Sequence, residues 1–386
     1  MRSMQSTIAG YASRLALAVL VSVVAFFAAE FAALRLWDVN ESLIVQIVEI
    51  GHETSRGFEE DSPFQSVDVE LMIRVLSGEQ AGNFFSIVAM QAEDVGVELR
   101  VGRNYVLVSD VFEDGSAQYS IADVFRLPSV ISVIILSCAL LAVFAGRAGV
   151  KALLGLGLSI ACLLWGFVPL AARGFSPVPL AFLAVFFISL VTVFCVVHRK
   201  QARIVALLGT LGGIGGAFII GYTTVWLWQL SGLAGEGAAL LSTTMLGIDM
   251  RGLFLASVLI AAVGAVLDVG ISITAAMSEL VEYDADIKLS RLWSAGVRVG
   301  TEILGSMINT LILAYLGTSL PIAILISSAE PSFLGLMNDP YVGQEIVLSL
   351  AGTAGLVLTV PITAAFFVLR EKISRRKKRA GRKVWA

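Results

Sequence analysis

Residues 252–275 read GLFLASVLIAAVGAVLDVGISITA and give the clearest indication of how this chain folds. The stretch is long enough to cross a bilayer as a helix, because about 20 apolar residues, each rising about 1.5 Å, cover a hydrocarbon core about 30 Å thick. Asp268 is its single ionisable residue. The stretch therefore predicts a transmembrane helix that carries one carboxyl group into the membrane.

Further stretches of the same apolar character are spread along the chain. They are residues 15–36, 129–146, 152–172, 178–197, 204–230, 298–325 and 344–369. The composition agrees, since 57% of the 386 residues are hydrophobic and 15% are charged, against about 45–50% and about 25% in soluble domains. Lipid offers no water to the backbone, so each span must be helical. We predict an α-helical polytopic membrane protein with about eight transmembrane helices.

Lysine and arginine gather in the connections that an eight-span arrangement places on one side. They are Arg2, Arg14, Arg147, Lys151, Arg199, Lys200, Arg203, Lys288, Arg291, Arg298 and the basic residues that follow the last span. The opposite short connections contain Arg173 and Arg251, near helix ends. Short connections rich in lysine and arginine stay in the cytoplasm. We therefore expect both termini in the cytoplasm and residues 38–127 on the extracytoplasmic side.

The first span has two interpretations. Residues 1–37 are predicted to form an uncleaved transmembrane anchor, because the apolar stretch is long. A cleaved signal peptide is the alternative, since Arg14 precedes the apolar run and Ala28 and Ala29 are small residues near its end. Both interpretations export the segment that follows.

The exported segment, residues 38–127, is acidic and contains short alternating patterns in place of long apolar runs. Alternation of apolar with other residues is the period of a half-buried strand. The expected strands are residues 43–50, 67–76, 84–90, 97–101 and 105–108, with a hairpin turn at Gly102. A small β-barrel, OB-like or SH3-like, would leave no strand edge exposed.

Two of the predicted spans carry polar side chains at helical spacing. On the sixth span they are Asp268, Ser272 and Glu279, and on the seventh Glu302, Ser306 and Asn309. Consecutive spans run in opposite directions, so Asp268 is expected at a depth between Glu302 and Asn309. An ionisable side chain inside a span costs about 2.5–3.5 kcal/mol. We therefore predict a shared ion- or substrate-binding site formed by Asp268, Ser272, Glu302, Ser306 and Asn309.

The donor atoms of this predicted site limit its ligand. Carboxylate, amide and hydroxyl oxygens suit a proton or a hard cation better than a thiophilic metal, and two nearby carboxyl groups can share a proton. No cofactor is identified. The alternative is that these groups only join helices by hydrogen bonds, or that the acidic ones pair with Arg291 or Arg298.

Weaker candidates lie outside this predicted site. Glu279 is expected near the aqueous interface. Thr223 and Thr224 follow a glycine-rich stretch, residues 209–221, that either packs closely against another helix or breaks. Asp249 belongs to residues 232–250, which are too short to span with ease and form either a re-entrant helix or an interfacial connector.

The tail at residues 371–386 is strongly basic. It includes Arg375, Arg376, Lys377, Lys378 and Arg379. Because it follows a span directly, we expect it to contact anionic lipid headgroups, at about 1 kcal/mol per residue. The net charge of the whole chain is −3, so nucleic acid is not an expected partner.

Two segments resemble a known family. GAVLDV at residues 264–269, continued by Ser272 and Glu279, resembles the signature of the YibE/F family of bacterial membrane proteins. Residues 296–321, which contain Glu302 and Asn309, resemble the next part of that signature. The resemblance covers roughly residues 130–370. It implies a bacterial inner-membrane protein of the longer kind, with an exported domain, whose partner is a shorter homologue or a second copy.

The sequence thus predicts an anchor (1–37), an exported β-rich domain (38–127), a seven-helix transmembrane domain (128–370) and a cytoplasmic tail (371–386). The leading hypothesis is a membrane permease or ion-coupled transporter. The alternative is a non-transporting scaffold or assembly protein whose exported domain docks an envelope partner. An enzyme is not expected, because the sequence contains no HExxH, Walker A or dinucleotide-binding motif.

Overall fold

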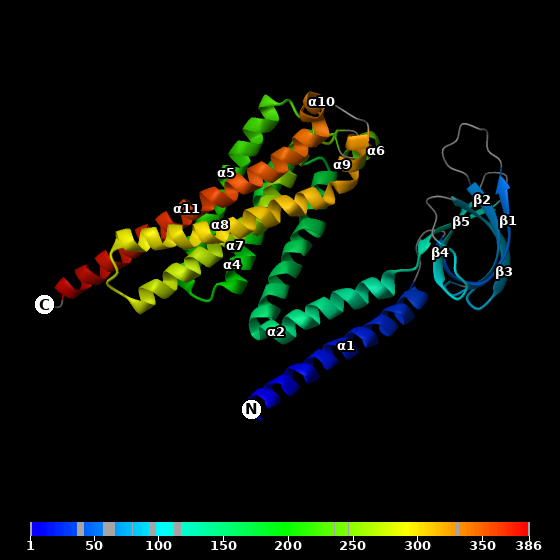
Figure 1. The fold of residues 1–386 in the computed structure, drawn as a ribbon, viewed down its shortest axis with the longest axis horizontal. Helices are drawn as coiled ribbons and strands as arrows, with labels where there is room; N and C mark the ends of the chain where they lie inside the picture. Colours follow the sequence, from blue (N-terminus) through cyan, green and yellow to red (C-terminus); the bar gives the residue numbers. More distant parts are fainter. Residues whose placement is uncertain are drawn as a thin grey trace. The chain divides into compact units, whose positions relative to one another are not determined.

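The computed structural model of the chain describes residues 2–36, 42–56, 66–78, 80–92, 98–111, 117–234, 236–245, 247–328 and 332–384. They divide into two compact units, Met1–Gly149 and Val150–Ala386. The first unit contains helix α1, a five-stranded barrel and most of helix α2, and the second contains the remaining helices (Figure 1). Each unit is described by itself.

The first unit is built on a closed barrel. Its strands are β1 (Ser42–Arg56), β2 (Ser66–Val75), β3 (Phe84–Ala92), β4 (Asn104–Val111) and β5 (Ala117–Val124). The order around the barrel is β1-β2-β3-β5-β4, and β4 closes it against β1. Only the β3–β5 pair is parallel among these pairs of described strands. Ile47, Leu71, Ile73 and Tyr105 fill the interior and are almost wholly buried, so the predicted small barrel is confirmed.

One predicted strand is wrong, and one observed strand is not among those predicted. Leu99 is irregular and Val101 lies in a turn, while Val97 is outside the described residues. The Tyr105 hydroxyl accepts a hydrogen bond from the backbone N–H of Arg100 at 2.8 Å and donates one to the backbone oxygen of Glu98 at 3.0 Å. A side chain thus satisfies backbone groups that a neighbouring strand would otherwise pair. The fifth strand of the barrel is β5.

The helices of the first unit are α1 (Arg2–Leu36) and the beginning of α2 (Leu127–Ala161). The Ser22 hydroxyl of α1 donates to the backbone oxygen of Ser132 on α2 at 2.9 Å. Asn104, at the start of β4, donates through its side-chain amide to Glu30 of α1 at 3.3 Å. These polar contacts join α1 to both α2 and the barrel.

The second unit is a bundle of helices. After α2 come the π-helical turn η1 (Cys162–Phe167), α3 (Val168–Ala172), α4 (Pro177–Val196), α5 (Lys200–Leu227), α6 (Glu236–Thr244), α7 (Met250–Tyr283), α8 (Leu289–Thr318), α9 (Leu320–Ser328), α10 (Phe333–Met337) and α11 (Pro340–Val384). Helix α7 contacts α4, α5, α8 and α11. Val266, Ile273 and Met277 of α7 are wholly buried, so this helix carries the centre of the core.

Helices α5 and α11 make the most extensive helix–helix contact (Figure 1). The glycines of α5 allow it: a Cβ atom at Gly209 would lie 2.8 Å from the Cβ of Thr363, and one at Gly213 would lie 2.9 Å from the backbone oxygen of Gly355. Helix α5 is unbroken from Lys200 to Leu227. The glycine-rich stretch therefore serves close packing and does not break the helix.

Seven helices are long and apolar enough to cross a membrane, judged by length and composition over the described residues, where eight spans are predicted. The difference lies in Leu127–Ala172, a continuous run of 46 residues. A straight helix of that length would measure about 69 Å, more than twice the hydrocarbon core. Gly146 interrupts the run with φ 55° and ψ −132°, so two helices meet at a kink between the two predicted spans; glycine adopts such a positive φ without a steric penalty. No loop separates the two predicted spans at Arg147–Lys151.

The predicted span at residues 298–325 does not continue to its expected end. Helix α8 ends at Thr318, Ser319 is a turn residue, and α9 begins at Leu320. Pro321 has no N–H to donate to the backbone oxygen of Gly317, so the helical hydrogen-bond ladder is interrupted here. Helix α11, by contrast, runs on to Val384 and includes most of the basic tail.

Candidate functional site

Helix α7 presents the first predicted polar stripe on its outer face. Asp268, Ser272 and Glu279 are exposed on the surface of the single chain. The opposite face of the helix carries Ile273 and Met277 and lies in the core. Asp268 is close to the middle of α7, which runs from Met250 to Tyr283. The stripe therefore places a carboxyl group near the middle of the helix, on a face that the other helices of the second unit leave exposed.

Helix α8 presents the second predicted stripe, also facing outward. A Cβ atom at Gly296 would lie 2.6 Å from the Met277 sulfur, and one at Gly300 would lie 2.9 Å from Cδ1 of Ile273. The glycines thus mark the face of α8 that packs on the bundle. Glu302 follows Gly300 by two residues, which is about 200° around the helix. It points away from the bundle and is exposed, as are Ser306 and Asn309.

The packing of α7 against α8 also sets the relative depth of the two stripes. Gly296 of α8 lies opposite Met277 of α7, and Gly300, four residues later, lies opposite Ile273, four residues earlier. The two helices are therefore antiparallel. Continued in this antiparallel register, Asp268 is level with Gly305. Asp268 then lies about 4.5 Å along the helix axis from Glu302 and about 6 Å from Asn309.

The two stripes share a depth but do not touch. Among the described residues, no hydrogen bond or ion pair joins Asp268 or Ser272 of α7 to the stripe on α8. The Ser306 hydroxyl donates to the backbone oxygen of Ile303 in its own helix at 3.1 Å. The structure therefore brings the predicted residues to one level of the bundle and leaves both carboxyl groups turned outward.

Glu279 belongs to a different cluster, at the end of α7. Its Oε1 lies 3.7 Å from the Arg199 guanidinium, which also pairs with Glu282 and donates to the backbone oxygen of Ser278 at 3.3 Å. The hydrogen bond with Glu282 raises the pKa of Arg199. Glu279 thus helps to fix the connection before α5 to the end of α7, apart from the Asp268 stripe.

The remaining secondary candidates have local partners. Thr223 and Thr224 donate to the backbone oxygen of Ile220 at 3.0 Å and 2.8 Å. Asp249 accepts from the backbone N–H of Gly252 at 2.9 Å and is the N-cap of α7. An aspartate just before a helix commonly has this role, so each of these groups has a structural explanation.

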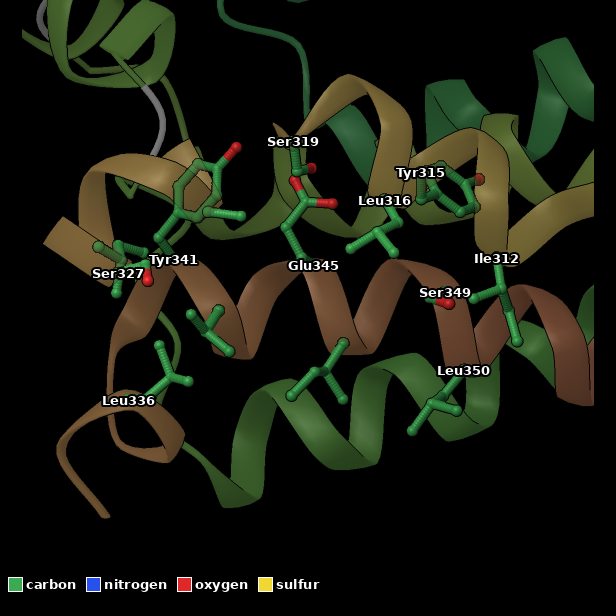
Figure 2. A pocket seen from close by; sticks show the side chains of 14 residues that line it. Ile312, Tyr315, Leu316, Ser319, Ser327, Leu336, Tyr341, Glu345, Ser349 and Leu350 are labelled. Carbon is green, nitrogen blue, oxygen red and sulfur yellow. The ribbon is translucent and has the colours of Figure 1, made fainter. Parts of the chain in front are cut away.

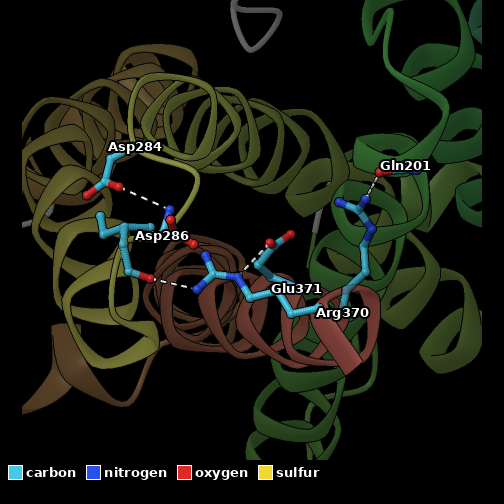
Figure 3. Close-up of polar contacts among 7 residues, drawn as sticks. Gln201, Asp284, Asp286, Arg370 and Glu371 are labelled. Atoms are coloured by element: carbon cyan, nitrogen blue, oxygen red, sulfur yellow. Dashed lines mark hydrogen bonds and ion pairs between the residues drawn. The ribbon is translucent and has the colours of Figure 1, made fainter. Parts of the chain in front are cut away.

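The basic end of α11 is tied to neighbouring elements (Figure 3). Arg375 donates to Glu371 at 2.9 Å and to the backbone oxygen of Ile287, in the connection between α7 and α8, at 2.8 Å. Arg370 bonds to Gln201 of α5. Arg376 is exposed, whereas the side chains of Lys377, Lys378 and Arg379 lie outside the described residues. Lipid contact by this segment stays a prediction.

A pocket of about 770 Å³ lies where α8, α9, α10 and the start of α11 meet (Figure 2). Glu345 and Tyr315 are among its lining residues, and neither is among the predicted site residues. The sequence does indicate Glu345 as a candidate, because it is the only charged residue in the apolar stretch 344–369. An ionisable residue inside a span is a functional candidate by default.

The described residues contain no group of three or more His, Cys, Asp or Glu side chains that could hold a metal ion.

Comparison with known proteins gives one match. No curated protein and no solved structure matches the chain significantly. The family model described as YibE/F-like protein matches residues 133–372. The match covers more than half of the chain and includes both polar stripes, the pocket and every helix from α4 to α10. It agrees with the resemblance noted at residues 264–269 and 296–321. The chain therefore belongs to the YibE/F-like family.

Proposed function

We propose that the chain is a membrane permease or ion-coupled transporter whose polar path uses Asp268 and Ser272 of α7 and Glu302, Ser306 and Asn309 of α8. One observation carries the proposal. Asp268 and Glu302 sit near the middle of membrane-length helices, are exposed on the single chain, and have no described partner.

The physical argument rests on the cost of such carboxyl groups in lipid. A charged side chain at the centre of a span costs about 2.5–3.5 kcal/mol, and such residues face protein or a water-filled cavity. A helix that only needed anchoring would carry apolar residues at these positions. Two carboxyl groups at one depth can bind a proton or a hard cation between them when another protein surface closes the space.

We propose that a second copy of the chain, or a shorter YibE/F homologue, closes this space. The exposed Gly264 and Ala275 of α7 and Gly305 of α8 border the stripes and allow close approach of another helix. In a two-fold dimer, equivalent residues lie at the same depth, so the stripes of two copies would face each other at matching levels.

Ion flux into vesicles tests the proposal. The full chain is reconstituted into liposomes that contain a pH-sensitive dye, and proton movement is recorded under an imposed potential with a series of monovalent and divalent cations outside. Flux above that of empty vesicles is expected. Asp268→Asn should reduce it to the empty-vesicle level, because the amide cannot exchange a proton or carry charge.

Asp286→Asn is the matched control, since Asp286 is an exposed carboxylate in the connection after α7 and should leave flux unchanged. Full flux in Asp268→Asn would overturn the proposed path.

The alternative function is a membrane scaffold whose barrel docks an envelope partner. Two observations favour it: the strand order β1-β2-β3-β5-β4 with a parallel β3–β5 pair, which supports an OB-like barrel, and a polar cavity of about 570 Å³ between the barrel and α1. Glu30, Arg103, Asn104 and Arg126 line this cavity. A scaffold would show no flux in any variant, while Asp268→Asn would change thermal stability or oligomeric state.

A further inference from the structure

The pocket at the ends of α8 and α11 is apolar over most of its wall. Its lining residues are Ile312, Tyr315, Leu316, Ser319, Ala323, Ile326, Ser327, Leu336, Tyr341, Val342, Glu345, Ile346, Ser349 and Leu350. Its volume of about 770 Å³ falls within the range of about 300–1,000 Å³ that small-molecule sites occupy. The pocket is thus large enough for an organic molecule with several rings.

The charge of the pocket wall comes from a single side chain, that of Glu345. Glu345 is the only charged residue among the lining side chains, and no ion pair involves it in the described part of the chain. Figure 2 shows its carboxyl group extending from α11 toward Ser319, into the space between α11 and the end of α8. A half-buried carboxylate in an apolar wall strongly favours a positive charge beside it.

Two aromatic side chains add to this preference. Tyr315 of α8 and Tyr341 at the start of α11 both line the pocket (Figure 2). The face of a tyrosine ring carries negative potential and attracts an organic cation within about 6 Å of its centre. The ring edges and bodies also provide apolar contact area. Carboxylate, tyrosine faces and aliphatic wall together complement a molecule that is both cationic and apolar.

We propose that this pocket binds a lipophilic organic cation, with Glu345 neutralising its charge and the aliphatic wall burying its apolar groups. A metal ion is a poor fit, because one carboxylate in an apolar wall cannot supply the six to eight oxygen ligands of calcium or the octahedral set of magnesium. An organic anion is excluded by Glu345 itself.

The site is separate from the Asp268 stripe and goes beyond the proposed transport function. Ile312 lines the pocket one turn after Asn309 of α8, so the two regions adjoin along that helix. Binding in the pocket needs no ion gradient and no flux. A chain that binds the cation but transports nothing would contradict the transport proposal and leave the proposed cation-binding pocket unaffected.

Binding of two probes of the same shape and opposite charge tests the inference. The full chain is placed in nanodiscs of zwitterionic lipid, and equilibrium binding of labelled tetraphenylphosphonium and tetraphenylborate is measured against empty nanodiscs. Saturable binding of the cation, and no saturable binding of the anion, is expected. Glu345→Gln should weaken cation binding about tenfold or more, because a charge-assisted contact is lost.

Three further variants make the result decisive. Glu345→Asp keeps the charge and should retain most of the binding even where Glu345→Gln lowers thermal stability. Tyr315→Leu removes a π face and should weaken binding, whereas Tyr315→Phe should not. Asp286→Asn, which alters an exposed carboxylate outside the pocket, is the control. Equal binding of both probes, or unchanged cation binding in Glu345→Gln at preserved folding, would overturn the assignment.

Discussion

Arg375 shows how a residue expected at the membrane surface can have an internal role. Its side chain is 24% exposed and that of its partner Glu371 is 12% exposed. It also donates to the backbone oxygen of Ile287 at 2.8 Å. One guanidinium thus fixes α11 to the connection between α7 and α8. Composition identifies a basic tail, but it does not reveal which arginine is used within the fold.

Replacing Arg375 should therefore destabilise the protein. Arg375→Ala removes both hydrogen bonds and leaves the carboxyl group of Glu371 largely buried without its cation, so the free energy of unfolding should fall by about 1–3 kcal/mol. Thermal unfolding of the purified protein in one detergent measures the change. Arg376→Ala, at an exposed neighbouring arginine, should shift the midpoint very little. Equal shifts in the two variants would contradict the role of Arg375.

Residue periodicity predicted which polar groups share a face, but not what that face contacts. Asp268 and Ser272 do lie on one side of α7, and Glu302, Ser306 and Asn309 on one side of α8. Spacing defines a direction relative to the helix axis only. The side that packs on the bundle is set by other residues, above all Gly296 and Gly300, whose missing side chains admit neighbours.

At the scale of elements, the glycines of α5 differ in whether another helix packs against them. Gly213 faces α11, where a Cβ atom would meet the Thr359 hydroxyl and lie 2.9 Å from the backbone oxygen of Gly355. Gly215 has nothing within 4 Å of the position its Cβ would take. Both lie inside the same helix, so they differ in their surroundings and not in their backbone.

This contrast gives a matched pair of substitutions. Gly213→Ala should force α5 and α11 apart and lower the free energy of unfolding by about 1–3 kcal/mol. Gly215→Ala should be neutral or stabilise the protein by up to about 1 kcal/mol, because alanine favours the helix. Thermal unfolding midpoints of the two variants, compared in the same detergent, measure the difference. A destabilised Gly215→Ala with an unaffected Gly213→Ala would contradict close packing of α5 against α11 at Gly213.

The barrel and the spans show where sequence patterns fail at this scale. Leu99 packs against the barrel core from an irregular segment. The alternation of Val97, Leu99 and Val101 therefore resembles a strand pattern although no strand forms at Leu99. Strand β5 packs Tyr119, Ile121 and Val124 against the core, and the step of three residues from Ile121 to Val124 departs from the strict alternation that indicates a strand. The spans are a different case, because Leu127–Ala172 counts as one membrane-length run by length and composition, yet the backbone kinks at Gly146, between the two predicted spans.

At the scale of the whole molecule, α7 and α8 expose polar side chains at a depth where a membrane-spanning helix would otherwise contact lipid. The exposed side chains Glu302, Ser306 and Asn309 occupy the side of α8 opposite its packed glycines. Interhelical hydrogen bonds and lost lipid contact both favour covering such a face with protein. The second copy that we propose would cover it, and Asn309 could then pair with its own equivalent across a two-fold axis.

Disulfide crosslinking between copies tests this assembly. Ser306→Cys, made in a chain whose Cys138, Cys162 and Cys195 have been replaced by serine, should form covalent dimers when membranes are treated with a mild oxidant. Two cysteines are joined only when their Cα atoms come within about 7 Å. The product should be seen on a non-reducing gel, at a yield that does not fall when the membranes are diluted with lipid.

The matched control is Leu304→Cys, because Leu304 packs against the core of its own chain on the other side of α8 and cannot reach a second copy through the same face. Ser306→Cys should crosslink and Leu304→Cys should not. Crosslinking of neither would leave α8 without a second copy against it and would favour a shorter homologue as the covering partner. Equal crosslinking of both would mean collision between unassembled chains and would contradict a dimer built on the Glu302 face.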